Sequence, residues 1–175
     1  MPQVSDDLTV RTVENHIVVD RPAKKVFDWV TTPKNMTRWF LLILGWDVYK
    51  GGPPDQPQKL GDSVTETVVP ATPGGPVRVN RYTVVALTPG FQWTVHSQKI
   101  LPDGTVSPHV GTIAVWTVQA LPGNKSLFVR LFFSARSDET PWTYPNRKGT
   151  AQDPELIQTG LVHLKELVEQ DLPSR

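Results

Sequence analysis

The residue types best suited to acid–base chemistry in this chain are its four histidines, His16, His96, His109 and His163. No two of them stand at a metal-ligand spacing, and no HExxH segment occurs. The chain also lacks cysteine, a GxSxG nucleophile elbow, a phosphate-binding glycine loop and a dinucleotide fingerprint. We therefore expect no metal and no cofactor, and any chemistry must come from side chains that the fold brings together.

His96 and Arg81 have the clearest chemical capacity as individual side chains. A neutral imidazole in a dry cavity can act as an acid or a base toward an enolisable carbonyl. A guanidinium can pair with a carboxylate or carbonyl oxygen of a ligand. Both residues fall in expected strands, where the alternative is a half-exposed or solvated side chain on the outer face of a sheet. The sequence does not decide between these alternatives.

Hydrophobic periodicity divides the chain into the elements that must position such side chains. We expect strands over 8–20, 46–50, 63–69, 78–87, 91–100, 110–121 and 127–135, short helices over 23–30 and 34–44, and a long helix over 154–172. Asp20 is expected to cap the first helix and Gly45 to end the second. Because consecutive strands are joined by short turns, the sheet should be an antiparallel meander.

The last helix has the strongest pattern. One side carries Leu156, Ile157, Gly160, Leu161, Leu164, Leu167 and Val168. Asp153 is suited to the N-cap and Pro154 to the first helical position. Gly160 costs about 1 kcal/mol relative to alanine in a helix. It therefore indicates either close packing of the helix on the sheet or room left for a ligand, with Leu164 one turn further along the same side.

The order of these elements predicts an α+β protein with an internal cavity. The concave face of a curved antiparallel sheet is apolar and must be covered by another layer. One helix, roughly 10 Å across, is narrower than a sheet of about seven strands. The two cannot fill each other completely, so we expect an enclosed space, closed at one end by the short helices and loops.

The segment 16–30 (HIVVDRPAKKVFDWV), followed by 33–36 and Trp39, resembles the beginning of proteins of the START-like (SRPBCC) superfamily. These proteins are also called polyketide cyclase/dehydrase-like or birch-pollen-allergen-like. Gly61-Asp62 and the joints at 87–90 and 122–124 fit as well, so the resemblance covers nearly the whole chain. It implies a helix-grip fold: a curved seven-stranded antiparallel sheet, two short helices after the first strand, and a long C-terminal helix. Members of the family bind lipids, sterols or plant hormones, cyclise polyketides, or activate a chaperone.

The resemblance further implies that strand side chains facing the cavity decide the ligand and any catalysis. The candidates on the expected strands are Glu66, Arg81, Tyr82, Trp93, His96, Trp116 and Arg130. Strand alternation places half of each strand inward. Over 127–135 the more uniformly apolar set, Leu127, Val129, Leu131 and Phe133, is expected inward, which predicts that Arg130 faces outward. Over 91–98, Trp93 or His96 can face inward, and over 110–121 the resemblance favours Trp116 inward.

Three aromatic residues, Trp46, Trp142 and Tyr144, are expected in loops or at the rim of the cavity. They could form a mouth that grips an aromatic ligand, or they could simply pack at an edge. Trp29 and Trp39 are expected in the core.

Composition excludes several classes of protein. Lys and Arg number 18 against 17 Asp and Glu, without a basic run, which argues against nucleic-acid binding. The longest apolar run, 39–44, is too short to span a bilayer, and the N-terminal residues are polar and acidic, so we expect a soluble cytoplasmic protein. A length of 175 residues suits a single domain over 1–175.

Three functional hypotheses follow. The first is binding of a small hydrophobic or aromatic ligand, such as a lipid or polyketide, in the cavity. The second is an enzyme of the polyketide cyclase/dehydrase type that uses His96, Arg81 and Tyr82 for proton transfer and enolate orientation. The third is an interaction module such as a chaperone activator, which would use an apolar patch on the sheet. Outward apolar residues on the late strands also leave room for a homodimer.

Overall fold

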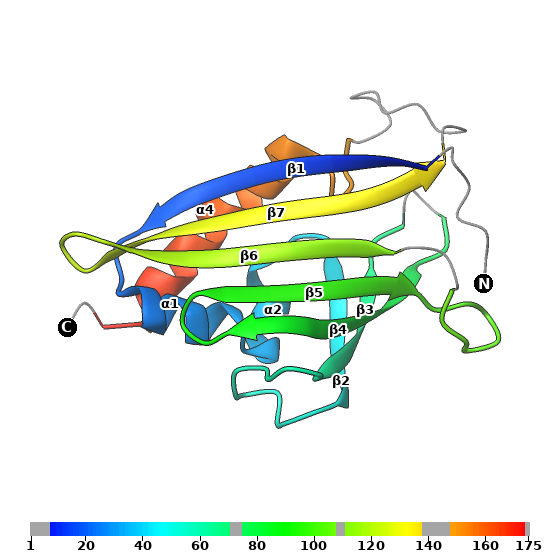
Figure 1. Ribbon diagram of the computed structural model, residues 1–175, viewed down its shortest axis with the longest axis horizontal. Helices are drawn as coiled ribbons and strands as arrows, with labels where there is room; N and C mark the ends of the chain where they lie inside the picture. The colour runs from blue at the N-terminus through cyan, green and yellow to red at the C-terminus, as the bar shows by residue number, and fades with distance from the viewer. Residues whose placement is uncertain (1–7, 71–74, 108–110, 138–147, 174–175) are drawn as a thin grey trace.

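The computed structural model describes residues 8–70, 75–107, 111–137 and 148–173. Within these ranges the elements are β1 (Leu8–Val19), α1 (Ala23–Val30), α2 (Pro33–Trp39), β2 (Ile43–Lys50), β3 (Ser63–Val68), β4 (Arg78–Thr88), β5 (Gln92–Lys99), β6 (Thr112–Leu121), β7 (Lys125–Ser137) and α4 (Pro154–Asp171). The predicted α+β element order is confirmed, from the two short helices after β1 to the long helix at the C-terminal end (Figure 1).

The described strands form one seven-stranded sheet in the order β1-β7-β6-β5-β4-β3-β2. Every neighbouring pair is antiparallel, as predicted. Because α1 and α2 carry the chain from one edge of the sheet to the other, β1 pairs with β7 and not with β2 (Figure 1). The sheet is therefore open, with β1 and β2 at its edges.

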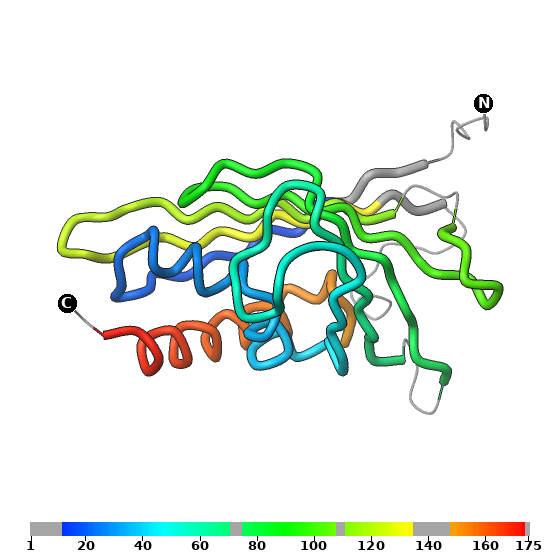
Figure 2. Tube along the Cα trace, turned by 90° about the horizontal axis from the view of Figure 1, so that it is seen from below, coloured from blue at the N-terminus to red at the C-terminus, as the bar shows by residue number. Residues whose placement is uncertain are grey.

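The long helix α4 lies along one face of the sheet, below the strands in the view of Figure 2. Its buried side consists of Ile157, Gly160, Leu161, Leu164 and Val168, which confirms the predicted amphipathic pattern. Its first turn is capped as expected, because the Asp153 carboxylate accepts hydrogen bonds from the backbone N–H groups of Glu155 and Leu156. No helix in the described part of the chain is long and apolar enough to cross a membrane.

The expected helix over 34–44 is wrong in its second half. Helix α2 ends at Trp39, and Phe40 already has extended backbone angles. The chain then enters β2, in which Ile43 pairs with Val68 and Gly45 with Thr67. Hydrogen bonding to β3 outweighs the helical spacing of this short apolar run. Gly45 is consequently a strand residue and not a helix cap.

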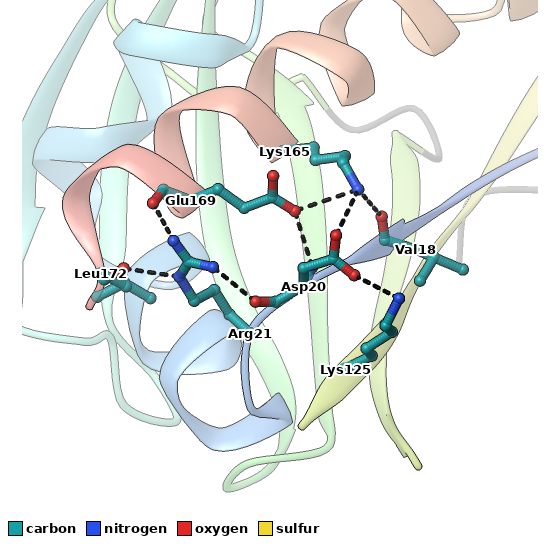
Figure 3. Close-up of polar contacts among 7 residues, drawn as sticks. All are labelled: Val18, Asp20, Arg21, Lys125, Lys165, Glu169 and Leu172. Carbon is teal, nitrogen blue, oxygen red and sulfur yellow. Dashed lines mark hydrogen bonds and ion pairs between the residues drawn. The ribbon is translucent and has the colours of Figure 1, made fainter. Parts of the chain in front are cut away.

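The expected role of Asp20 as a helix cap is also wrong. Helix α1 has Pro22 at its N-cap and no side-chain cap. The Asp20 carboxylate instead lies 3.0 Å from Lys125 Nζ and 3.7 Å from Lys165 Nζ, and so joins the end of β1 to the start of β7 and to α4 (Figure 3). These ion pairs lower the pKa of Asp20, with the hydrogen bond from Lys125 as the largest cause.

The neighbouring Arg21 caps the opposite end of α4. Its Nε–H donates to the Leu172 carbonyl at 2.6 Å, and its Nη2 donates to the Glu169 carbonyl (Figure 3). The last carbonyl groups of a helix lack partners within the helix, so a cation at this position satisfies them. The backbone N–H of Asp20 also donates to the Glu169 carboxylate at 2.8 Å. The C-terminal end of α4 is thereby held to the end of β1.

Candidate functional site

A cavity of about 160 Å³ lies against the inner face of the sheet, and none of its lining residues belongs to α4. The strands β3 to β7 supply most of its wall, and Phe40, Leu42 and residues 150–152 close it from the other side. Its lining is Phe40, Leu42, Glu66, Val68, Arg78, Asn80, Tyr82, Val95, Ser97, Thr112, Ala114, Trp116, Arg130, Phe132, Ser134, Thr150, Ala151 and Gln152. The predicted space beside the helix is present, but loops rather than α4 itself form its outer wall.

The lining decides which face of β5 points inward. Val95 and Ser97 line the cavity. Because side chains alternate along a strand, His96 projects from the opposite face. The imidazole is partly buried there, and burial lowers its pKa. The structure therefore does not bring His96 into the cavity.

The same alternation separates Tyr82 from Arg81 on β4. Tyr82 lines the cavity together with Asn80. Arg81 lies on the outer face, where its guanidinium is 3.2 Å from the centroid of the Tyr49 ring. Of the residues expected to carry proton transfer, the structure places only Tyr82 at the cavity.

The prediction that Arg130 faces outward is wrong. Arg130 is fully buried, as is Phe128, and Arg130 and Phe132 both line the cavity. Both faces of β7 carry large apolar side chains, so choosing the face that is apolar throughout selected the wrong one. Aromatic side chains bury more area than aliphatic ones, and the two phenylalanines beside Arg130 were the available signal.

The Arg130 guanidinium is held mainly by aromatic faces. It lies 4.4 Å from the Phe132 ring centroid and 5.6 Å from that of Phe40. Its Nη2 donates to the Ala151 carbonyl at 3.2 Å. Its Nε and Nη1 are buried and have no hydrogen-bond partner among the described residues. Burial lowers the pKa of Arg130 to about 9, which leaves the group positively charged at neutral pH.

Glu66 places a buried carboxyl group in the same cavity. Its Oε1 accepts hydrogen bonds from Asn80 Nδ2 at 2.8 Å and Ser97 Oγ at 2.9 Å. Burial raises the pKa of Glu66, because the charged form loses water, and these two hydrogen bonds partly offset that effect. The charges of Glu66 and Arg130 shift each other's pKa through space, and no hydrogen bond joins the two side chains.

Tyr82 and Trp116 add two further polar groups to the wall. The Tyr82 hydroxyl and the Trp116 indole N–H are buried without partners in the described part of the chain. Burial raises the pKa of Tyr82 well above its usual range, and the nearby Glu66 adds to the effect. The Tyr82 phenol therefore stays protonated and can donate a hydrogen bond to a ligand. Trp116 is directly opposite Arg130 in the pairing of β6 with β7.

Trp93 and Trp46 support this wall from behind. The Trp93 ring centroid is 4.3 Å from that of Trp116 and 5.8 Å from that of Tyr82. The Trp46 ring lies 4.9 Å from Tyr82 on its other side. The Trp93–Trp116 and Trp46–Tyr82 contacts are edge-to-face and the Trp93–Tyr82 contact is tilted. Such contacts stabilise the orientation of each ring. Trp93 and Trp46 therefore position lining residues and do not line the cavity themselves.

Gly160 and Leu164 lie away from the cavity. A Cβ atom on Gly160 would be 3.4 Å from the Trp39 carbonyl oxygen, so α4 packs closely on the end of α2 at this residue and leaves just enough room for a methyl group. Leu164 is fully buried in the core. The other two predicted residues, Trp142 and Tyr144, fall outside the described residues. Within the described ranges, no group of three His, Cys, Asp or Glu side chains gathers to hold a metal ion.

No sequence family and no curated protein matches this chain at the level of sequence. Solved structures of similar shape do exist. A START superfamily protein from Mycobacterium smegmatis is 14% identical with a TM-score of 0.63, over 92% of this chain and 99% of that chain. The Zhui aromatase/cyclase from Streptomyces sp. R1128 is 14% identical with a TM-score of 0.62, over 94% and 97%. Ara h 8.0201 is 13% identical with a TM-score of 0.62, over 93% and 99%.

These similarities and the strand order define the fold. The chain has the START-like helix-grip fold, in which a curved antiparallel sheet grips a long C-terminal helix. At such low identity the shared property is the architecture, and the side chains in the cavity must be considered on their own.

Proposed function

We propose that this protein binds a small aromatic or largely apolar molecule in its cavity. The observation that carries the proposal is the cavity of about 160 Å³, which combines apolar walls with buried polar groups that have no partner in the described part of the protein. Ligand sites in proteins are typically apolar hollows with a few convergent polar groups that fix orientation.

The volume limits the size of the ligand. An engineered cavity of about 150 Å³ accommodates benzene, so this one suits a ligand of about six to ten non-hydrogen atoms. A single aromatic ring with a short substituent meets that limit. Within the classes expected from the sequence, a monocyclic aromatic compound is therefore favoured over a sterol or a long-chain lipid.

Acid–base catalysis is a second candidate. The specific observation in its favour is that Glu66, whose pKa is raised by burial, and Tyr82, which burial keeps protonated, line the same cavity as Arg130. The Tyr82 phenol and the Arg130 cation could polarise the carbonyl group of a ligand, and the Glu66 carboxyl group could exchange a proton with it. His96 and Arg81 have no part in this version, because both lie on the outer face of the sheet.

A thermal-shift screen tests the binding proposal. A ligand present at about 100 times its Kd stabilises the folded state by about 2.7 kcal/mol, which corresponds to roughly 5–10 °C for a chain of this size. We expect shifts of this order with monocyclic aromatic compounds and none with sterols or long-chain fatty acids. The proposal fails if monocyclic compounds leave the melting temperature unchanged.

Several expectations from the sequence stay predictions. These are the single-domain organisation, the cytoplasmic location, the absence of nucleic-acid binding, the homodimer and the interaction module. Light scattering of the purified protein would test the homodimer directly.

A further inference from the structure

Arg130 is a buried cation that no carboxylate of the described chain contacts. Its Nη2 donates to the Ala151 carbonyl, and its Nε and Nη1 donate to no described residue. A buried charge without a partner is costly, and replacing it with an apolar side chain of similar volume is often neutral or stabilising. Cation–π contacts with Phe132 and Phe40 reduce this cost but leave the N–H groups unsatisfied.

The unsatisfied groups at the cavity are mostly donors. Besides Arg130, the Trp116 indole N–H has no partner in the described part of the chain, and the Tyr82 hydroxyl is able to donate. Against these donors stands one unpaired buried acceptor of the described lining, Gln152 Oε1. The acidic residue of the lining, Glu66, already accepts two hydrogen bonds at Oε1, from Asn80 and Ser97. The wall therefore complements an oxygen acceptor rather than an amine.

We propose that the ligand is a monocyclic aromatic acid whose anionic oxygen group, a carboxylate or a phenolate, binds the Arg130 guanidinium. The ring would lie against the apolar part of the lining, which includes Val95, Ala114 and Phe132. Anionic acceptors form shorter and stronger hydrogen bonds with a guanidinium than neutral ones. This inference rests on the proposed binding function and adds the charge of the ligand to it.

Isothermal titration of the intact protein at pH 7 with three probes tests the inference. Benzoate carries the ring and the carboxylate, benzamide is its neutral counterpart, and toluene supplies the ring alone. A charge-assisted hydrogen bond contributes about 1.5–3 kcal/mol, so benzoate should bind at least about tenfold more tightly than benzamide. Toluene reports whether the cavity accepts a ring at all.

Two matched variants locate the effect. Arg130→Met removes the cation but keeps an apolar side chain, and should abolish the preference for benzoate while leaving toluene binding in place. Arg81→Met makes the same change on the outer face of the sheet and should leave the affinities for the three probes unchanged. If Arg130→Met does not fold, the ranking of the probes on the unmodified protein decides the question.

The outcomes separate the two proposals. Toluene binding without a preference for benzoate over benzamide overturns the anion inference and leaves the binding function standing. A preference that persists in Arg130→Met also overturns it. Failure of all three probes to bind contradicts both proposals. A preference for benzoate that disappears in Arg130→Met and persists in Arg81→Met supports both.

Discussion

Filling the cavity should stabilise the protein and abolish binding at the same time. Ala114 lies in the centre of the inner face, paired with Val95 on β5 and with Phe132 on β7, and all three line the cavity. Ala114→Leu would place an enlarged side chain in the space that a ligand needs. In an already close-packed interior the same change would cause steric strain.

The size of the effect follows from the atoms added. Leucine carries three more carbon atoms than alanine, and each buried methylene group contributes about 0.8 kcal/mol, which gives an upper limit near 2.4 kcal/mol. Imperfect fit lowers this value, so we expect the free energy of unfolding to rise by about 1–2 kcal/mol. The added atoms amount to half the carbon atoms of benzene and would occupy much of the space that a single aromatic ring needs. Binding of toluene should therefore weaken beyond detection.

Urea unfolding and toluene titration together give both readouts. Ala120→Leu is the matched control, because Ala120 lies on the same strand but is exposed to solvent. It should change neither the free energy of unfolding by more than about 0.5 kcal/mol nor the affinity for toluene. A loss of more than about 2 kcal/mol in Ala114→Leu, or toluene binding at the original affinity, would show that the space is not available as described.

Three further predictions concern single residues. Because burial raises the pKa of Glu66, ionised Glu66 destabilises the folded state at pH values above the folded-state pKa, and this cost disappears as the pH falls below the unfolded-state pKa. Glu66→Gln should therefore increase the free energy of unfolding at pH 8 and change it little at pH 4, and an equal effect at the two pH values would contradict this reasoning. Arg21→Met removes the donors at the end of α4 and should cost about 1–2 kcal/mol in urea unfolding without changing the affinity for toluene; an unchanged unfolding midpoint would count against the cap. Gly160→Ala should raise the free energy of unfolding by up to about 1 kcal/mol, since the added methyl group would make an ordinary contact with the Trp39 carbonyl; reduced ligand binding in this variant would mean that the helix forms part of the cavity after all.

The architecture was largely predictable from the sequence because it depends on periodicity. The spacing of apolar residues in 154–172, with Asp153 before them, predicts an amphipathic helix, and α4 is that helix. The segment 39–44 could not be resolved in the same way, because its residues are apolar throughout and fit a helix or a strand equally. There the pairing of Ile43 with Val68, a contact distant in sequence, decided the outcome.

The site was less predictable because it depends on which face of each strand is inward. On β4 and β5 adjacent residues point to opposite faces of the sheet. A shift of one residue therefore decides whether Tyr82 or Arg81, and Val95 or His96, faces the cavity. Both faces of β7 carry large apolar side chains, so the position of Arg130 became visible only when its pairing with β1 and β6 was known. The position of the cavity relative to α4 likewise depends on where α2 ends, which the sequence pattern placed too late.

The indole N–H signals of the tryptophans give the most direct test of a ligand cavity at this position. In a ¹H–¹⁵N NMR titration with toluene, the chemical shift of the Trp116 indole N–H should change and then level off as the cavity fills. The reason is that Trp116 lines the cavity and its N–H has no hydrogen-bond partner among the described residues. The Trp29 signal should stay in place, because its N–H donates to Asp171 at 2.9 Å near the end of α4. A titration in which Trp116 does not move, or in which Trp29 moves as much, would contradict the account.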